Sequence, residues 1–144
     1  MSRSWVYEHS IGSLAISAEQ LGTHLVVCIS GGNAPHIGSV VLSESRPSLT
    51  GSGKSATSSV LNRLGHKDEV IARVVSDRLA AHLDTVVCCI CGIHKDNATP
   101  KDIRSCETLG EEVARFLLEH LMDQNETPDM PLIDPTIPTD PDRS

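Results

Sequence analysis

The chain has 144 residues, a formal net charge of −7 and a pI of about 5.4, with only one Trp, one Tyr and one Phe. This length corresponds to one domain with a single core. The acidic charge and the scarcity of aromatic rings disfavour nucleic-acid binding, which relies on basic surfaces and stacked aromatic side chains. No stretch approaches the roughly 20 apolar residues that a membrane span requires.

The N-terminus lacks the apolar run of a signal peptide. The five cysteines are an odd number and lie mostly in apolar runs, which is typical of reduced thiols rather than of a disulfide framework. We therefore expect a cytoplasmic protein without contact to a membrane.

Four strands are predicted in the first half of the chain. Apolar residues alternate over residues 5–17 but are interrupted at Gly12, which indicates one bent strand or two short ones. Further apolar runs predict strands over residues 24–30, 37–42 and 56–61.

A polar loop is predicted between the last two of these strands, over residues 46–57. It contains Gly51-Ser52-Gly53-Lys54-Ser55, which is part of a phosphate-binding P-loop pattern. The full pattern requires glycine where Ser48 stands, and no helical pattern follows at once. We therefore interpret the segment as a mobile loop.

Two amphipathic helices flank one more strand in the second half. Apolar residues recur at helical spacing over residues 70–83 and again over residues 101–122, and Thr99 and Pro100 form a start signal for the second helix. The β-branched run over residues 85–91 predicts a buried strand between them.

This order of elements predicts the fold class. Consecutive strands with short links favour antiparallel pairing, and two helices with one apolar side each would cover one face of the sheet. We expect an α+β, two-layer domain with a mainly antiparallel sheet over residues 1–124. Residues 125–144 are rich in Pro and Asp and are predicted to be disordered.

Three predicted turns carry more polar groups than routine links need. They contain His36, then His66 and Lys67, then His94, Asp96 and Asn97. If the turns converge, imidazoles, a lysine and carboxylates would meet beside helix N-termini, which suits a phosphate or a divalent metal ion. The simpler alternative is that Asp96 and Asn97 only make turn and cap hydrogen bonds.

The pattern Cys88-Cys89-x-Cys91 allows a metal-binding interpretation. In a strand, Cys89 and Cys91 share one face while Cys88 points to the other, and no second pair of cysteines is present. Buried thiols that behave as small apolar side chains are the better interpretation.

Taken together, these motifs resemble the LpdD-like prenylated-flavin chaperones, which are related by fold to proteasome assembly chaperones. The resemblance extends from about Val6 to Leu121. It rests on Gly31-Gly32 with Pro35-His36-Ile37-Gly38, Arg46-Pro47-Ser48-Leu49, Ala56-Thr57-Ser58-Ser59-Val60, Gly65-His66-Lys67-Asp68, and Gly92-Ile93-His94 with Asp96-Asn97-Ala98-Thr99.

The resemblance implies an accessory protein that holds prenylated FMN, or FMN, and assists its delivery to, or oxidative maturation in, a UbiD-type (de)carboxylase. Arg46, Lys67 and the two helix N-termini are the groups we would assign to the phosphate. The remaining site residues would contact the ligand directly or through a divalent metal ion held by the three imidazoles; they are His36, His66, His94, Asp96 and Asn97. A homodimer is expected, because helices on one face leave the other face of the sheet uncovered.

Two other classes of function are open. The protein would be a metal-dependent hydrolase or lyase if His36, His66 and His94 bind one ion and Asp96 acts as a base. It would be an assembly chaperone module without a ligand if the polar turns are surface caps.

Overall fold

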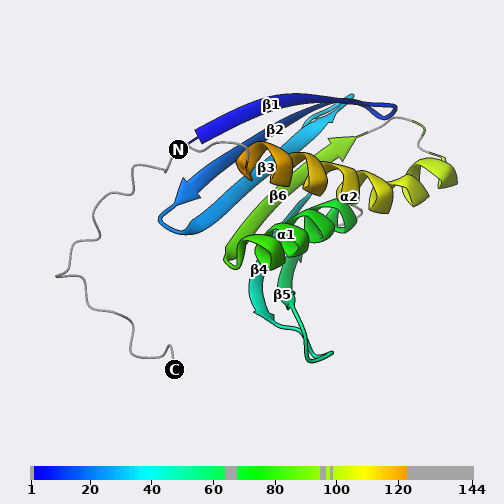
Figure 1. Cartoon of the computed structure of the whole chain (residues 1–144). Coiled ribbons are helices and arrows are strands. Elements are labelled where there is room, and N and C mark those ends of the chain that lie inside the picture. The colour runs from blue at the N-terminus through cyan, green and yellow to red at the C-terminus, as the bar shows by residue number, and fades with distance from the viewer. Residues whose placement is uncertain (1, 64–67, 95–96, 98, 123–144) are drawn as a thin grey trace.

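The computed structural model describes residues 2–63, 68–94, 97 and 99–122. Within them the chain forms six strands and two helices (Figure 1). In chain order these are β1 (Ser2–His9), β2 (Gly12–Leu21), β3 (His24–Gly32), β4 (Ser39–Pro47), β5 (Lys54–Asn62), α1 (Glu69–Leu83), β6 (Val86–His94) and α2 (Pro100–Met122).

The strands form one sheet in the order β1-β2-β3-β6-β4-β5. Neighbouring strands are antiparallel except β3 and β6, which run parallel. This exception arises because β6 enters the sheet between β3 and β4, after the chain has returned through α1. The alternating segment at residues 5–17 forms two strands, since the chain reverses at Gly12, whose φ of 131° is disfavoured for other residues.

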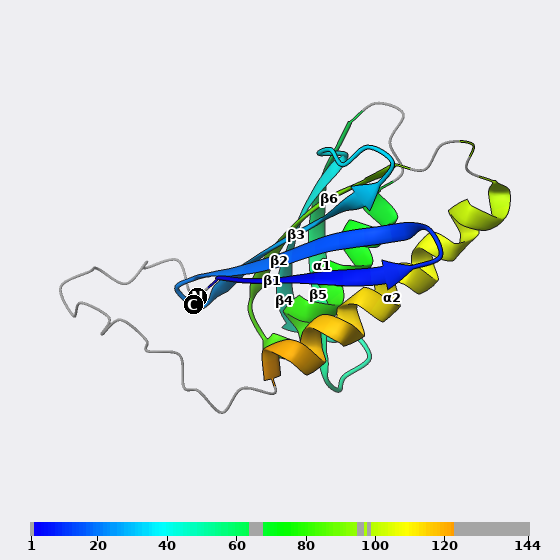
Figure 2. The ribbon, with the colours of Figure 1, turned by 90° about the horizontal axis from the view of Figure 1, so that it is seen from above.

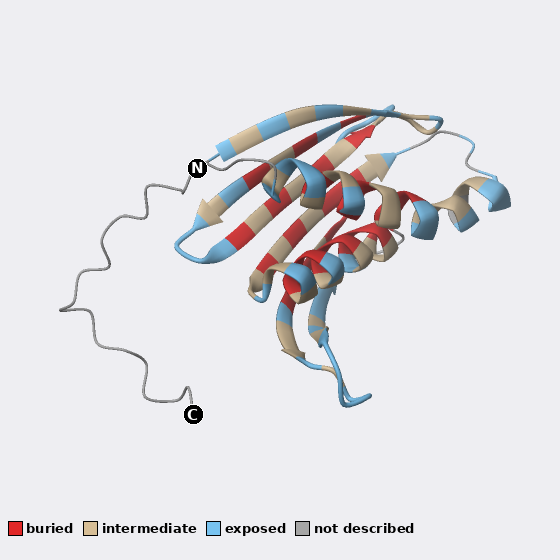
Figure 3. Cartoon of the chain, viewed as in Figure 1, coloured by how far each residue is buried: buried red, intermediate tan, exposed pale blue. Residues whose placement is uncertain are grey.

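Both helices cover the same face of the sheet, which confirms the expected α+β, two-layer fold (Figures 1 and 2). Side chains on this face are buried in rows across the strands, as the red bands in Figure 3 show. One row consists of Ile16, Ile29 and Cys91, which are paired in register and at most 1% exposed. The period of two in the strands and of 3.6 in the helices therefore places the apolar residues in one core.

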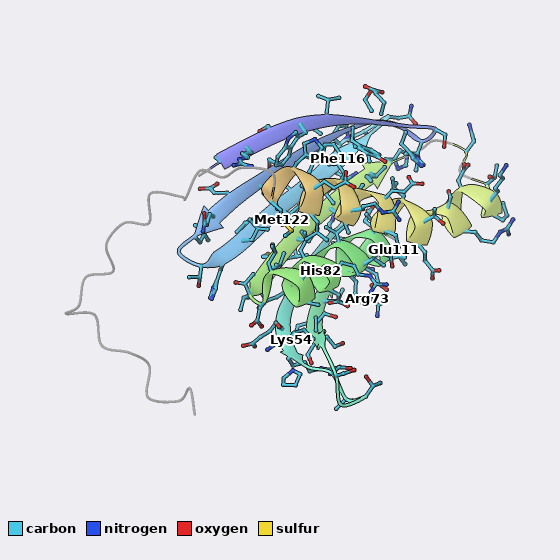
Figure 4. The ribbon with its side chains drawn as sticks, viewed as in Figure 1. Lys54, Arg73, His82, Glu111, Phe116 and Met122 are labelled. Atoms are coloured by element: carbon cyan, nitrogen blue, oxygen red, sulfur yellow. The ribbon has the colours of Figure 1, made fainter. Side chains whose placement is uncertain are left out.

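All three aromatic side chains lie where α2 meets β1. The ring of Phe116, labelled in Figure 4, makes edge contacts with Trp5 and Tyr7 at centroid distances of 6.0 and 5.2 Å.

The two helices are joined by an ion pair in which Arg78 Nη2 lies 2.8 Å from Oε1 of Glu111. Neither helix in the described part of the chain is long and apolar enough to span a bilayer.

The loop predicted over residues 46–57 is shorter than expected. β4 continues to Pro47 and β5 begins at Lys54, so the two strands form a hairpin that extends from the sheet (Figure 1). The Ser48 N–H donates to the Gly53 carbonyl at 3.0 Å and closes the turn. The prediction was wrong because Ser and Thr residues in an exposed edge strand lack the apolar alternation of a half-buried strand. The tail predicted at residues 125–144 lies outside the described residues.

Candidate functional site

The loop of residues 33–38, here called the crossing loop, passes from β3 to β4 over the last residues of β6. At one end the Asn33 N–H donates to the His94 carbonyl at 2.7 Å, and at the other the Gly38 N–H donates to the Cys91 carbonyl at 3.0 Å. Between them the chain lies directly against Gly92, where any Cβ would overlap the carbonyl group of His36. Gly92 is therefore required for this close crossing.

Asp68 connects the crossing loop to the sheet and to α1. Its Oδ2 lies 3.3 Å from Nε2 of His36, and its Oδ1 accepts the Ile93 N–H at 3.0 Å. The other ring nitrogen of His36, Nδ1, donates to the Ala34 carbonyl at 2.8 Å. Gly38 leaves the room for this carboxylate, because a Cβ there would overlap it. Asp68, which is only 7% exposed, thus holds His36 in a defined position at the start of α1.

His94, the last residue of β6, lies beside this pair. The ring centroids of His36 and His94 are 6.3 Å apart, and His94 is exposed at the end of the sheet. Asn97 follows with a φ of 55°, a left-handed conformation that asparagine tolerates better than most residues. The structure therefore brings His36 and His94 together, with Asn97 three residues beyond. The other candidates of these turns, His66, Lys67 and Asp96, lie outside the described residues.

Arg46 lies at the opposite end of the sheet. β4 begins at Ser39 near the crossing loop and runs away from it, and seven strand residues correspond to about 23 Å. The Arg46 guanidinium donates to Thr57 Oγ1 at 2.9 Å and to the Pro47 carbonyl at 3.1 Å. Contact between Arg46 and a ligand at His94 stays a prediction, and within one chain that ligand would have to extend along most of β4.

Carboxylates already lie at both helix N-termini. Asp68 and Glu69 begin α1, and at α2 the Thr99 N–H donates to Oδ2 of Asp102 at 2.8 Å while the Asp102 N–H donates to Thr99 Oγ1 at 3.2 Å. This reciprocal pair confirms the predicted start of α2 at Thr99 and Pro100. These side chains compete with an external anion for the positive end of each helix.

The thiols of β6 are held in their neutral form. Burial raises the pKa of Cys89 and of Cys91, both of which face the helices, and it raises the pKa of the half-buried Cys88. A thiol must lose its proton to bind a metal ion well or to act as a nucleophile. This agrees with the interpretation of these cysteines as apolar strand residues.

A model of the prenylated flavin chaperone LpdD-like domain matches residues 10–122. The chain belongs to this family. The match covers most of the chain and includes the crossing loop, Asp68 and His94.

The fold also resembles that of a solved assembly chaperone. The structure aligns with a chain of a chaperone complex for yeast 20S proteasome assembly at a TM-score of 0.50 and 10% sequence identity, covering 83% of this chain and 94% of that one. At this identity the likeness establishes the fold alone. A comparison with curated proteins finds no match.

No group of three or more potential metal ligands occurs among the described residues of this LpdD-like chain. The predicted metal site of His36, His66 and His94 includes one residue outside that part, so its geometry stays a prediction. Both ring nitrogens of His36 already have partners, and at least one of these contacts would have to break for His36 to bind a metal ion.

Asp68 was not among the candidate site residues selected from the sequence. The available signal was the run of polar residues from His66 to Glu69 directly before an apolar helix. Such a run is normally explained by helix capping and the helix dipole. The contact between Asp68 and Ile93 depends on β6 lying beside α1, which sequence spacing does not reveal.

Proposed function

We propose that this protein binds prenylated FMN, or FMN, and assists its delivery to, or oxidative maturation in, a UbiD-type (de)carboxylase. The observation that carries the proposal is the match of the prenylated flavin chaperone LpdD-like family over residues 10–122. A chaperone of this kind must hold the phosphate of the ligand and shield its ring, and it must release both to the partner enzyme.

The proposed ligand site is the end of the sheet at the crossing loop. His94 offers an exposed imidazole there, beside the fixed ring of His36. Lys67 directly precedes Asp68 in the chain, and we assign the phosphate mainly to this lysine. The amide of Asn97 and the side chains of His66 and Asp96 complete the proposed set. The helix N–H groups are secondary because Asp68, Glu69 and Asp102 occupy both N-termini.

Direct contact is the better proposal for the imidazoles than coordination of a metal ion. In its present position His36 donates from Nδ1 to the Ala34 carbonyl, and its Nε2 lies 3.3 Å from Oδ2 of Asp68. Placing a divalent ion on His36 would give up at least one of these contacts. Titrations with and without a chelator distinguish the two arrangements, since only coordination depends on the ion.

The binding site is tested with two alanine variants and one matched control. Lys67→Ala and His94→Ala should each weaken prenylated FMN binding by about tenfold to a hundredfold, because a charge-assisted hydrogen bond contributes roughly 1.5–3 kcal/mol. The control is Lys54→Ala. It removes a lysine at the far end of the sheet, where Nζ of Lys54 lies 3.3 Å from Oδ1 of Asp84 (Figure 4).

Equal affinities of all three variants and the wild-type protein would contradict this site. If Lys67→Ala and His94→Ala keep the wild-type affinity for prenylated FMN and Arg46→Ala loses it, the phosphate binds at the opposite end of β4 instead.

The partner assignment is tested by transfer of the ligand. Prenylated FMN bound to this protein should activate a UbiD-type apo-decarboxylase faster, or to a higher final activity, than the same amount of free cofactor. We further propose that the chaperone acts as a homodimer, because both helices of the described part of the chain lie on the same face of its sheet.

A further inference from the structure

The sheet face opposite the helices, here called the open face, carries a compact apolar patch. Six side chains of the three central strands point to it, because they alternate with the buried residues of the core. They are Val26 and Cys28 of β3, Cys88 and Ile90 of β6, and Val40 and Leu42 of β4. The register pairs Val26 and Leu42 with Cys88, and it pairs Cys28 and Val40 with Ile90, so the six form two adjacent rows.

No described residue outside the sheet and the crossing loop covers this patch. Both helices lie on the other face, as Figures 1 and 2 show. Leu42 is 50% exposed, and Leu61, which is paired with Val40 in the neighbouring strand, is 76% exposed. Apolar side chains gathered on one exposed surface are typical of an interface.

Charged groups on the open face are confined to its rim. By strand alternation Glu8, Glu19, Glu44 and Arg46 point to this face, and all four lie nearer the ends of their strands than the patch centre. The centre of the patch is therefore neutral. A second copy placed on it brings no like charges together there, so the patch is compatible with itself.

The size of the open face suits a dimer. Six strands about 4.8 Å apart, each of at least eight residues that rise about 3.3 Å, give a face of roughly 24 by 26 Å. Covering it on two copies removes at least about 1,200 Å² of surface in total, which is the lower end of the range for stable interfaces. A sheet also fits another sheet well, since twisted sheets stack face to face at about 10 Å.

We propose that a second copy of this chain covers the open face, so that two sheets form a β-sandwich with the helices outside. The two-fold axis passes near Cys88 and Ile90, and these residues meet their own counterparts. The crossing loop bounds the interface at one end, because it lies over Gly92 on the same face and exposes Ile37 there. This interface specifies the proposed homodimer but does not depend on the proposed ligand.

The first test is the mass of the full chain in solution, by sedimentation equilibrium, with a matched pair of variants. Leu42→Glu places a carboxylate in the patch and should raise the dimer dissociation constant by at least about a hundredfold. Leu49→Glu makes the same change at the tip of the β4–β5 hairpin, where Leu49 is 90% exposed, and should leave the dimer intact. A monomeric wild-type protein at about 50 µM, or a Leu42→Glu variant that stays dimeric, overturns the proposal.

A second test uses the wild-type protein and needs no variant to fold. Cys28 and Cys88 should react slowly with a thiol reagent in the dimer and faster on dilution, whereas Cys89 and Cys91 stay unreactive on the helix side of the sheet. Fast reaction of Cys28 and Cys88 at all protein concentrations overturns the proposal. Protection in a monomer also overturns it, because a segment of the same chain would then cover the face. Titration of the Leu42→Glu monomer with prenylated FMN shows whether the variant still binds the ligand. It thereby separates loss of the dimer from loss of the ligand site.

Discussion

Replacement of Gly92 by alanine tests the arrangement that positions His36. Gly92 lies in β6 directly under the crossing loop, and a Cβ there would overlap the His36 carbonyl group, with the Gly38 nitrogen only 3.2 Å away. All of these are backbone atoms, so no flexible side chain can move aside. The crossing loop must lift from β6 in the variant.

The loss of unfolding free energy in Gly92→Ala follows from the contacts that the crossing loop loses when it lifts. Two backbone hydrogen bonds hold it, Asn33 N–H to the His94 carbonyl and Gly38 N–H to the Cys91 carbonyl. Each contributes about 0.5–1.5 kcal/mol, and overpacking that is not relieved costs about 1–3 kcal/mol. Lifting the loop relieves strain while it breaks bonds, so the two costs do not simply add. We expect Gly92→Ala to lower the free energy of unfolding by about 2–4 kcal/mol.

Urea unfolding measures this change, with Gly51→Ala as the control. Gly51 has a φ of 88° and open space around it, so its replacement costs only backbone strain of about 1–2 kcal/mol. The imidazole NMR signals of His36 and His94 should shift in Gly92→Ala and stay unchanged in Gly51→Ala. A Gly92→Ala variant with wild-type stability and unshifted signals would refute the close crossing of the loop over β6.

Two further substitutions test the groups around the site. Asp68→Ala removes the acceptor of the Ile93 N–H and should cost about 1.5–3 kcal/mol of unfolding free energy, whereas Asp68→Asn keeps an oxygen there and should cost less; equal losses in urea unfolding would contradict this role. Thr99→Ala removes the cap of α2 and should cost about 0.5–2 kcal/mol. Amide exchange in the first turn of α2 should speed up, and unchanged exchange would show that the cap is dispensable.

The fold was predictable where apolar periodicity is strong. The run at residues 85–91 and the two amphipathic helices gave the central strand and the helix layer, because burial on one side imposes a regular pattern. The edge strand β5 was only partly predicted, since its Ser and Thr residues face solvent. The parallel pairing of β3 with β6 was not predictable, because it joins residues about sixty positions apart through nonlocal contacts.

The candidate site was predictable in part for the same reason. His36 and His94 were selected as polar residues at strand ends, and the parallel arrangement of β3 and β6 brings those two ends together. Arg46 was grouped with them from its residue type, but the direction of β4 carries it to the other end of the sheet. Asp68 was not selected as a site residue because its partners belong to β6 and the crossing loop.

Equilibrium titration of the wild-type protein with prenylated FMN, followed by absorbance and fluorescence, measures directly whether this protein carries the cofactor. We predict saturable binding at one ligand per chain, weakened by Lys67→Ala and His94→Ala and unchanged by Lys54→Ala. Absence of saturable binding by the wild-type protein, under conditions where it is folded, would contradict the claim that this protein carries the cofactor.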